Sequence, residues 1–253
     1  EGNSIEHPSG ICVGRLGELY ITDQSNHSVF WVFEGVASAI YSAPRYKNGD
    51  LIEGEPTIPT SIRLNSSEEI IVLFLGDGSI RKFDRKGVQS VLLQSGVIKT
   101  PSDIALNDED ELFVVSALDK KVYKVVNDNE VIVVAGTDNK SATALDGVIA
   151  TESSLGEPVS IDFDISNRLY IADNLFGSIR VVTPDGIIGT ITDKANRIFY
   201  IDQLRVNNYK LTTLYTTHSL QHKITRVQFQ NLAPNSRVDF IEYPYYTLEK
   251  DGV

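Results

Sequence analysis

One sequence pattern recurs five times along this chain, and a recurring unit of this size constrains the fold more than any other feature does. Each copy opens with a short run in which apolar and polar residues alternate, as in Ser61-Ile62-Arg63-Leu64. The copies begin at Ser9, Thr60, Ser102, Val159 and Asp202. In the first four copies a second run starts ten residues later, at Leu19 in the first and Leu169 in the fourth. Units this similar must pack against one another in a repeating way.

The runs within each copy have the two-residue period of β-strands and not the longer period of helices. Leu19–Asp23 and Leu169–Asp173 are nearly the same strand, and Gly78-Ser79-Ile80-Arg81 returns as Gly177-Ser178-Ile179-Arg180. Polar turns such as Pro184-Asp185-Gly186 separate the runs, as β-hairpins require. The sequence therefore predicts an all-β fold, a β-propeller built from four-stranded blades.

The best-preserved copies share their motif with a known family. The first copy reads His7-Pro8-Ser9-Gly10-Ile11-Cys12-Val13, then Leu19–Asp23, then Asn26-His27-Ser28-Val29. The fourth copy follows the same pattern through Gly177–Val182. This pattern resembles the NHL repeat, and the resemblance extends over about residues 7–192. Because NHL-type propellers usually have six blades, the resemblance implies six-bladed ancestry, with five repeats recognisable and a sixth blade absent or not included.

We expect a single propeller domain over residues 1–253. Its blades would occupy residues 7–43, 59–94, 100–136, 157–193 and 198–243, and residues 244–253 would form a linker-like tail. No apolar run approaches the ~18 residues of a membrane span, so we expect no membrane insertion. The chain starts at Glu1 and not at Met, which favours a processed protein in an extracytoplasmic location.

The charge of the chain favours some partners over others. The formal net charge is −11, and the Lys and Arg residues are dispersed along strands and turns. Nucleic-acid binding depends on clustered basic residues that neutralise phosphates, so we expect no nucleic-acid partner. An acidic surface instead favours neutral or basic partners.

The turn after the second strand of each blade and the linkers between blades share one face of a propeller, and loops on a rigid scaffold commonly carry recognition. The residues expected to bind a protein or peptide there are His27, Asp77, Asp119, Phe176 and His218 in the turns and Arg45 and Tyr46 in the linker after the first blade. Tyr46, Phe176 and Arg45 would be the anchors. Asp23 and Asp173 are expected to cap backbone N–H groups of their turns. The alternative interpretation of the long linkers, as plain spacers between blades, is equally favoured.

One position of the innermost strand carries charged residues in three blades. The five residues at this position are Cys12, Arg63, Ala105, Asp162 and Arg205. Arg63, Asp162 and Arg205 would therefore ring the central channel. The favoured interpretation is a water-filled channel whose charges pair and fix the geometry of the blades. The other interpretation is a small-molecule or ion site in the mouth of the channel.

The sequence lacks the usual marks of catalysis and of metal binding. It has no Ser-His-Asp constellation, phosphate-binding glycine loop, EF-hand or cysteine metal site. His218 and His222 have a spacing that would suit zinc on a helix, but they flank a strand turn, so we expect no metal and no cofactor. We therefore predict a non-enzymatic module that binds a protein or peptide. The alternative is a Ca²⁺-dependent hydrolase or lactonase centred on the channel, where only Asp162 is a well-placed carboxylate.

Overall fold

A computed structural model describes most of the chain, namely residues 4–44, 49–53, 55–84, 87–139, 143–192, 200–207, 213–218, 223–229 and 238–244. The regular secondary structure of this part is β-strand alone, in agreement with the predicted fold class. It accordingly contains no helix that could cross a membrane. β21 ends at Pro244, the first residue of the predicted tail, and the rest of that tail lies outside the described residues.

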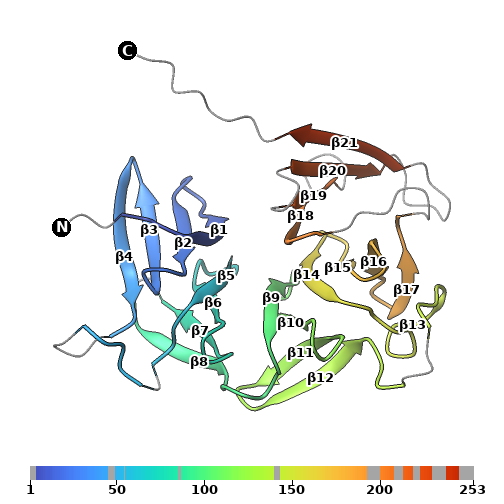
Figure 1. Ribbon diagram of the computed structural model, residues 1–253, viewed down its shortest axis with the longest axis horizontal. Helices are drawn as coiled ribbons and strands as arrows, with labels where there is room; N and C mark the ends of the chain where they lie inside the picture. The colour runs from blue at the N-terminus through green and yellow to red at the C-terminus, as the bar shows by residue number, and fades with distance from the viewer. Residues whose placement is uncertain are drawn as a thin grey trace.

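The strands form five antiparallel sheets, one for each predicted blade (Figure 1). In chain order the blades consist of β1 (Pro8–Val13), β2 (Leu19–Asp23), β3 (Ser28–Phe33) and β4 (Val36–Ser42); β5 (Pro59–Leu64), β6 (Ile70–Phe74), β7 (Ile80–Phe83) and β8 (Gln89–Leu93); β9 (Pro101–Leu106), β10 (Leu112–Ser116), β11 (Lys121–Asn127) and β12 (Glu130–Ala135); β14 (Pro158–Phe163), β15 (Leu169–Asp173), β16 (Ser178–Val182) and β17 (Ile187–Thr190); and β18 (Gln203–Asn207), β19 (Thr213–His218), β20 (Lys223–Phe229) and β21 (Val238–Pro244). A short strand, β13 (Val148–Ile149), pairs with β17 at the edge of the fourth blade.

The first strand of each blade lies nearest the centre of the ring (Figure 1). Neighbouring inner strands pack side by side from β1 to β5, from β5 to β9, from β9 to β14 and from β14 to β18. The blades thus share a central axis, as a propeller requires.

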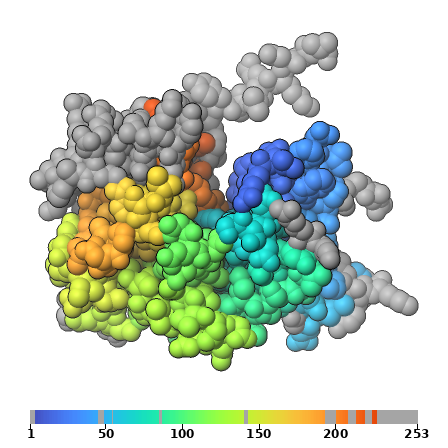
Figure 2. All heavy atoms as spheres, turned by 180° about the vertical axis from the view of Figure 1, so that it is seen from behind, coloured from blue at the N-terminus to red at the C-terminus, as the bar shows by residue number. Residues whose placement is uncertain are grey.

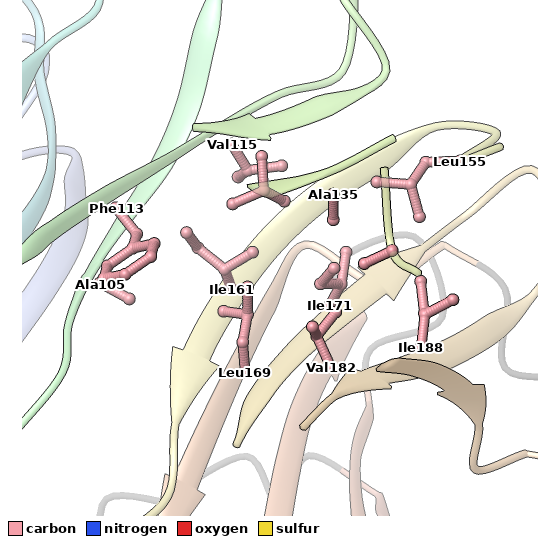
Figure 3. Packing of buried hydrophobic residues seen from close by; sticks show 12 residues of the cluster. Ala105, Phe113, Val115, Ala135, Leu155, Ile161, Leu169, Ile171, Val182 and Ile188 are labelled. Atoms are coloured by element: carbon pink, nitrogen blue, oxygen red, sulfur yellow. The ribbon is translucent and has the colours of Figure 1, made fainter. Parts of the chain in front are cut away.

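Consecutive blades pack face to face because alternate residues of each strand point toward the preceding or the following blade. At the junction of the third and fourth blades, Phe113 and Val115 of β10 lie against Ile161 of β14 (Figure 3). The ring of Phe113 also contacts that of Phe163, with centroids 4.7 Å apart. Each such buried side chain contributes roughly 1.5–3 kcal/mol, so these junctions hold the ring together.

The ring is open between the first and fifth blades. In Figure 1, β1 and β18 stand apart on this side. Figure 2 shows a notch between the first blade, in blue, and the described part of the fifth, in orange. Near the axis, the Gln203 side-chain amide donates a hydrogen bond of 2.8 Å to the Ser9 carbonyl. On this side Ile11 and Val13 of β1 are exposed.

Candidate functional site: an apolar hollow on the turn face

A hollow of about 480 Å³ lies where the turns that follow the second strands of the second and third blades meet the start of the fourth blade. It is lined by Leu75, Thr100, Pro101, Ser102, Ala117, Leu118 and Glu157. Its lining is mostly apolar, and Leu118 is 65% exposed. Small-molecule and side-chain sites commonly combine an apolar lining with a few polar groups, as this hollow does.

Hydrogen bonds from the ends of the second strands hold the lining in place. The Ser116 hydroxyl donates to the Lys99 carbonyl at 2.6 Å and accepts the backbone N–H of Asp119 at 3.0 Å. The turn that carries Ala117 and Leu118 is thereby fixed to the strand start at Thr100. In the second blade, the backbone N–H of Leu75 donates to the Ile58 carbonyl at 2.9 Å.

The fourth blade fixes the polar rim of the hollow in the same way. Asp173, fully buried at the end of β15, accepts the backbone N–H of Gly156 at 2.7 Å and that of Glu157 at 2.9 Å. Leu175 is exposed two residues further on and lies against Gly156. Asp173 therefore fixes the backbone of Glu157, which lines the hollow, and Leu175 lies beside that backbone at Gly156.

The first blade uses an aspartate at the same position. Asp23 is buried and accepts backbone N–H groups of Asn26 and Glu6, at 3.0 and 2.6 Å. Burial acts to raise the pKa of Asp23, but the hydrogen bonds from Asn26, Glu6 and His7 outweigh it and lower that pKa. Asp23 thus caps its turn, as expected. The N–H groups that Asp173 accepts belong instead to the linker before the fourth blade.

Several of the predicted binding residues are engaged in hydrogen bonds within their own turns, to a neighbouring strand or to a linker. Asp77 accepts the backbone N–H of Ser79 at 3.0 Å and its hydroxyl at 2.8 Å. Asp119 accepts the Tyr123 hydroxyl at 3.2 Å. His27 has a φ of 51° and accepts the backbone N–H of Ile58 on its Nδ1, at 3.2 Å. These three side chains are half-buried and do not line the hollow.

The other predicted binding residues fall in three different surroundings. Phe176 is half-buried next to the exposed Leu175. Arg45 and Tyr46 lie outside the described residues. His218 was expected on the exposed face, but it is fully buried, with Nε2 2.8 Å from the Thr216 hydroxyl. The physical reason is its position: it is the last residue of its second strand, where the other blades also bury a side chain.

The predicted channel residues gather around a carboxylate that the sequence analysis did not single out. Asp103 is almost fully buried and accepts a hydrogen bond from Arg205 Nη1 at 3.0 Å and from Arg63 Nη2 at 3.3 Å. The hydroxyls of Ser61 and Ser160 also donate to it. One side chain of the third blade thereby joins the second, fourth and fifth blades at the axis.

Electrostatics explain why Asp103 stays charged there. Burial alone would raise the pKa of Asp103, but Arg205 and Arg63, with the two serine hydroxyls, hold it at about 2. Burial and the charge of Arg205 act to lower the pKa of Arg63, yet a guanidinium remains charged in proteins. The pairing favours the predicted channel whose charges satisfy one another.

Asp162, the other channel carboxylate, makes different contacts. Its two oxygens accept the backbone N–H groups of Phe163 at 3.0 Å and Val206 at 2.8 Å. Burial raises the pKa of Asp162, while Arg63 and Arg205 oppose the shift. Within the part of the chain that the structure describes, no three His, Cys, Asp or Glu side chains are grouped so that they could hold a metal ion.

The sequence pattern indicates two features of these sites that are not among the predictions above. Asp103 lies two residues before Ala105, so simple alternation places both side chains on the same side of the inner strand. Leu118 and Leu175 stand in turns, where an apolar side chain has no strand face to cover it. A leucine two residues after the second strand, found in the third and fourth copies, indicates an exposed apolar surface on this face.

Comparison with known families agrees with the sequence pattern. The NHL repeat matches residues 6–32, which contain β1, β2 and most of β3. Together with the five four-stranded blades, this match supports an NHL-repeat propeller, as the sequence predicted. No curated protein sequence matches significantly.

Several solved propellers share the fold at low sequence identity. A streptogramin B lyase matches with a TM-score of 0.63 and 15% identity, over 94% of this chain and 68% of its own. A protein assigned as a gluconolactonase matches with 0.62 and 13%, over 94% and 77%. An auxiliary nutrient binding protein from Bacteroides ovatus matches with 0.60 and 12%, over 85% and 57%. Such identities show a shared fold, which both enzymes and binding proteins use.

Proposed function

We propose that this NHL-repeat β-propeller is a non-enzymatic module that binds a protein or peptide on its turn face. The observation that carries the proposal is the hollow lined by Leu75, Ala117 and Leu118, with the acidic Glu157 also in its lining. Exposed apolar side chains that gather around a concave surface are characteristic of interaction sites.

The rigidity of the lining supports binding. The turns are fixed by buried hydrogen-bonding groups, Ser116 in the third blade and Asp173 in the fourth. A surface that is already ordered loses little conformational entropy when a partner binds, so more of the contact energy is kept as affinity. Burying one leucine-sized side chain in the hollow would contribute roughly 1.5–3 kcal/mol.

The chemistry of the hollow specifies the kind of peptide. An apolar side chain would fill the space between Leu75 and Leu118, and a neighbouring Lys or Arg would meet the carboxylate of Glu157. The net charge of −11 favours the same cationic partner at longer range and speeds its encounter. We therefore expect a peptide in which an apolar residue lies next to a basic one.

The proposal is tested by panning a random peptide library on the protein and measuring the affinities of the selected peptides by calorimetry. We expect Leu118→Glu to weaken binding at least about tenfold, since it removes a contact of this size. The matched control is Leu16→Glu, because Leu16 is 82% exposed in the turn at the opposite end of the second strand. Selected peptides that bind Leu118→Glu as tightly as the wild type would contradict the proposal.

The alternative, a Ca²⁺-dependent hydrolase at the channel, would need carboxylates that are free to bind the ion. Asp103 is paired with two arginines, and Asp162 accepts two backbone N–H groups. We therefore expect millimolar Ca²⁺ to leave the melting temperature unchanged. A rise of several degrees that Asp162→Ala abolishes would favour the alternative, because a ligand that binds only the folded protein stabilises it.

A further inference from the structure

A second pair of exposed apolar side chains lies on the turn face, beside the fourth blade. Leu175 and Tyr200 are each 57% exposed. The side-chain amide of Asn174 donates to the Ile201 carbonyl at 2.9 Å, and its oxygen accepts the Ile201 N–H at 2.8 Å. Because Leu175 directly follows Asn174 and Tyr200 directly precedes Ile201, these hydrogen bonds hold the leucine and the tyrosine on adjoining segments.

This pair repeats, one blade further on, an arrangement that is already present in the hollow. Leu118 and Leu175 each stand two residues after the second strand of their blade. Glu157 and Tyr200 each stand two residues before the start of a copy of the sequence pattern. Leu175 and Tyr200 therefore take, between the fourth and fifth blades, the place that Leu118 and Glu157 take between the third and fourth.

The backbone agrees with this equivalence. Tyr200 has a φ of 59°, and Ile58 and Thr100, at the same position of the second and third copies, have φ values of 57° and 41°. Bulky and β-branched residues seldom adopt this left-handed conformation, so its recurrence marks one structural position. Thr100 lines the hollow from that position, and Tyr200 is held at the corresponding point of the next junction.

The linker before the fourth blade connects the hollow to the second pair. Leu175 lies against Gly156, where a Cβ would clash with it. The next residue, Glu157, lines the hollow, and its carbonyl accepts the backbone N–H of Asn174 at 2.9 Å. Glu157 therefore borders both the hollow and the second pair, and the exposed apolar surface continues from Leu118 to Leu175 past one carboxylate.

We propose that Leu175 and Tyr200 form a second subsite, and that the bound peptide carries one apolar residue for each subsite with a basic residue between them. The inference rests on the binding function proposed above and adds the order of the peptide's residues. The hollow takes the first apolar side chain, and Leu175 with the ring of Tyr200 takes the second. The basic side chain meets Glu157, which borders both.

The chemistry of the second subsite suits an apolar or aromatic side chain. A tyrosine ring offers a large contact area at a small cost in conformational entropy, and tyrosine is enriched among the residues that dominate interfaces. A second contact made by the same peptide is intramolecular once the first has formed, so two modest subsites give a higher affinity than either alone.

Calorimetry with peptides selected by panning on the wild type tests the proposal. Leu175→Ser and Tyr200→Ser should each weaken binding at least about fivefold, because each removes part of one apolar contact. The matched control is Ile165→Ser, since Ile165 is 73% exposed in the turn between the first two strands of the same blade. The control should leave the affinity within about twofold of the wild type, and melting curves show that each variant is folded.

Double-mutant cycles assign each peptide residue to its subsite. Replacing one apolar residue of the peptide by Ala should cost at least about tenfold with the wild type and no more than about twofold with Leu118→Glu. Replacing the other should show the same loss of effect with Leu175→Ser. Replacing the basic residue between them by Gln should have no effect with Glu157→Gln.

The outcomes separate this inference from the function on which it rests. Binding that is weakened by Leu118→Glu but not by Leu175→Ser or Tyr200→Ser would overturn the second subsite and leave the proposed function in place. Binding that Leu118→Glu does not weaken would contradict both. A basic residue selected outside the two apolar ones would overturn the order. Self-association of the wild type that Leu175→Ser abolishes, measured by sedimentation, would assign this surface to a second copy and overturn the proposal.

Discussion

Replacing Asp103 by Ala should be among the most damaging single changes in this protein. Asp103 lies at the axis and accepts hydrogen bonds from Arg63, Arg205, Ser61 and Ser160. Asp103→Ala would leave the two guanidinium groups without their carboxylate and the hydroxyls without their acceptor. The change acts on four blades at once.

The magnitude follows from the burial of the pair. Removal of one partner of a buried ion pair costs about 3–5 kcal/mol, because the remaining charge stays desolvated. A loss of that size is a large part of the 5–15 kcal/mol by which a domain is typically stable. Replacing the whole cluster, with Asp103→Ala, Arg63→Met and Arg205→Met together, should recover most of the loss, since apolar groups of similar size replace buried charges at little net cost.

The assay is urea denaturation followed by the fluorescence of Trp31, the one tryptophan of the chain. The control is Glu111→Ala, which breaks the more exposed pair between Glu111 and Lys124 and should cost no more than about 1 kcal/mol. An Asp103→Ala variant within about 1 kcal/mol of the wild type would refute the reasoning, and so would a triple variant less stable than Asp103→Ala alone.

The pKa of Asp103 predicts that the folded protein loses stability at acidic pH. The pKa of Asp103 falls from 3.8 to about 2 on folding, so the folded protein binds the proton less tightly than the unfolded chain. Ionised Asp103 therefore stabilises the folded protein by about 2 kcal/mol above about pH 4, and this contribution is lost as the pH falls toward 2. Asp103→Asn should remove this part of the acid sensitivity, and an unchanged acid profile would contradict the assignment.

Three other predictions concern single residues. Because burial raises the pKa of Cys12 to about 12, its thiol should react with maleimide at least about 100-fold more slowly than free cysteine, and a rate within tenfold would contradict this. A Cβ on Gly136 would clash with the Lys120 carbonyl oxygen at a φ of 89°, so Gly136→Ala should lower the free energy of unfolding by about 2–3 kcal/mol in urea denaturation. The control is Gly35→Ala, where a Cβ would meet no atom within 4 Å and the expected loss is about 1 kcal/mol. Arg180 is 1% exposed with Nε and Nη1 unpaired, and the Asp146 side chain that pairs with its Nη2 is 57% exposed. Arg180→Met should therefore cost under about 1 kcal/mol by urea denaturation, and a loss above about 3 kcal/mol would contradict this.

The fold could be predicted because alternation is a strong physical signal. A strand such as Leu169–Asp173 repeats apolar residues at the period that a packed sheet requires, and a position such as Ile62 recurs because the second to fifth blades bury it in the same way. Repetition then strengthens the signal, since four copies with the same internal spacing and a fifth close to it have few alternative arrangements.

The site could be predicted only in part, because its contacts lie between blades. Alternation places Arg63 on the axis side of its strand, but it does not show that the long side chain reaches the carboxylate of Asp103 in the next blade. His218 and Asp173 both end a second strand and are both buried, and only the structure shows how the first lies against Thr216. Leu75 follows the apolar run of β6, so the sequence does not distinguish it from a strand residue.

The proposed binding site depends on how the blades are held together at the axis. The hollow extends from the second to the fourth blade, and the blades that carry it are joined at the axis by Asp103. The turns and linkers that shape the hollow are fixed by Ser116 and Asp173. The affinity of the hollow for a peptide therefore rests on the rigid stacking of blades around Asp103, because an ordered surface loses little conformational entropy on binding.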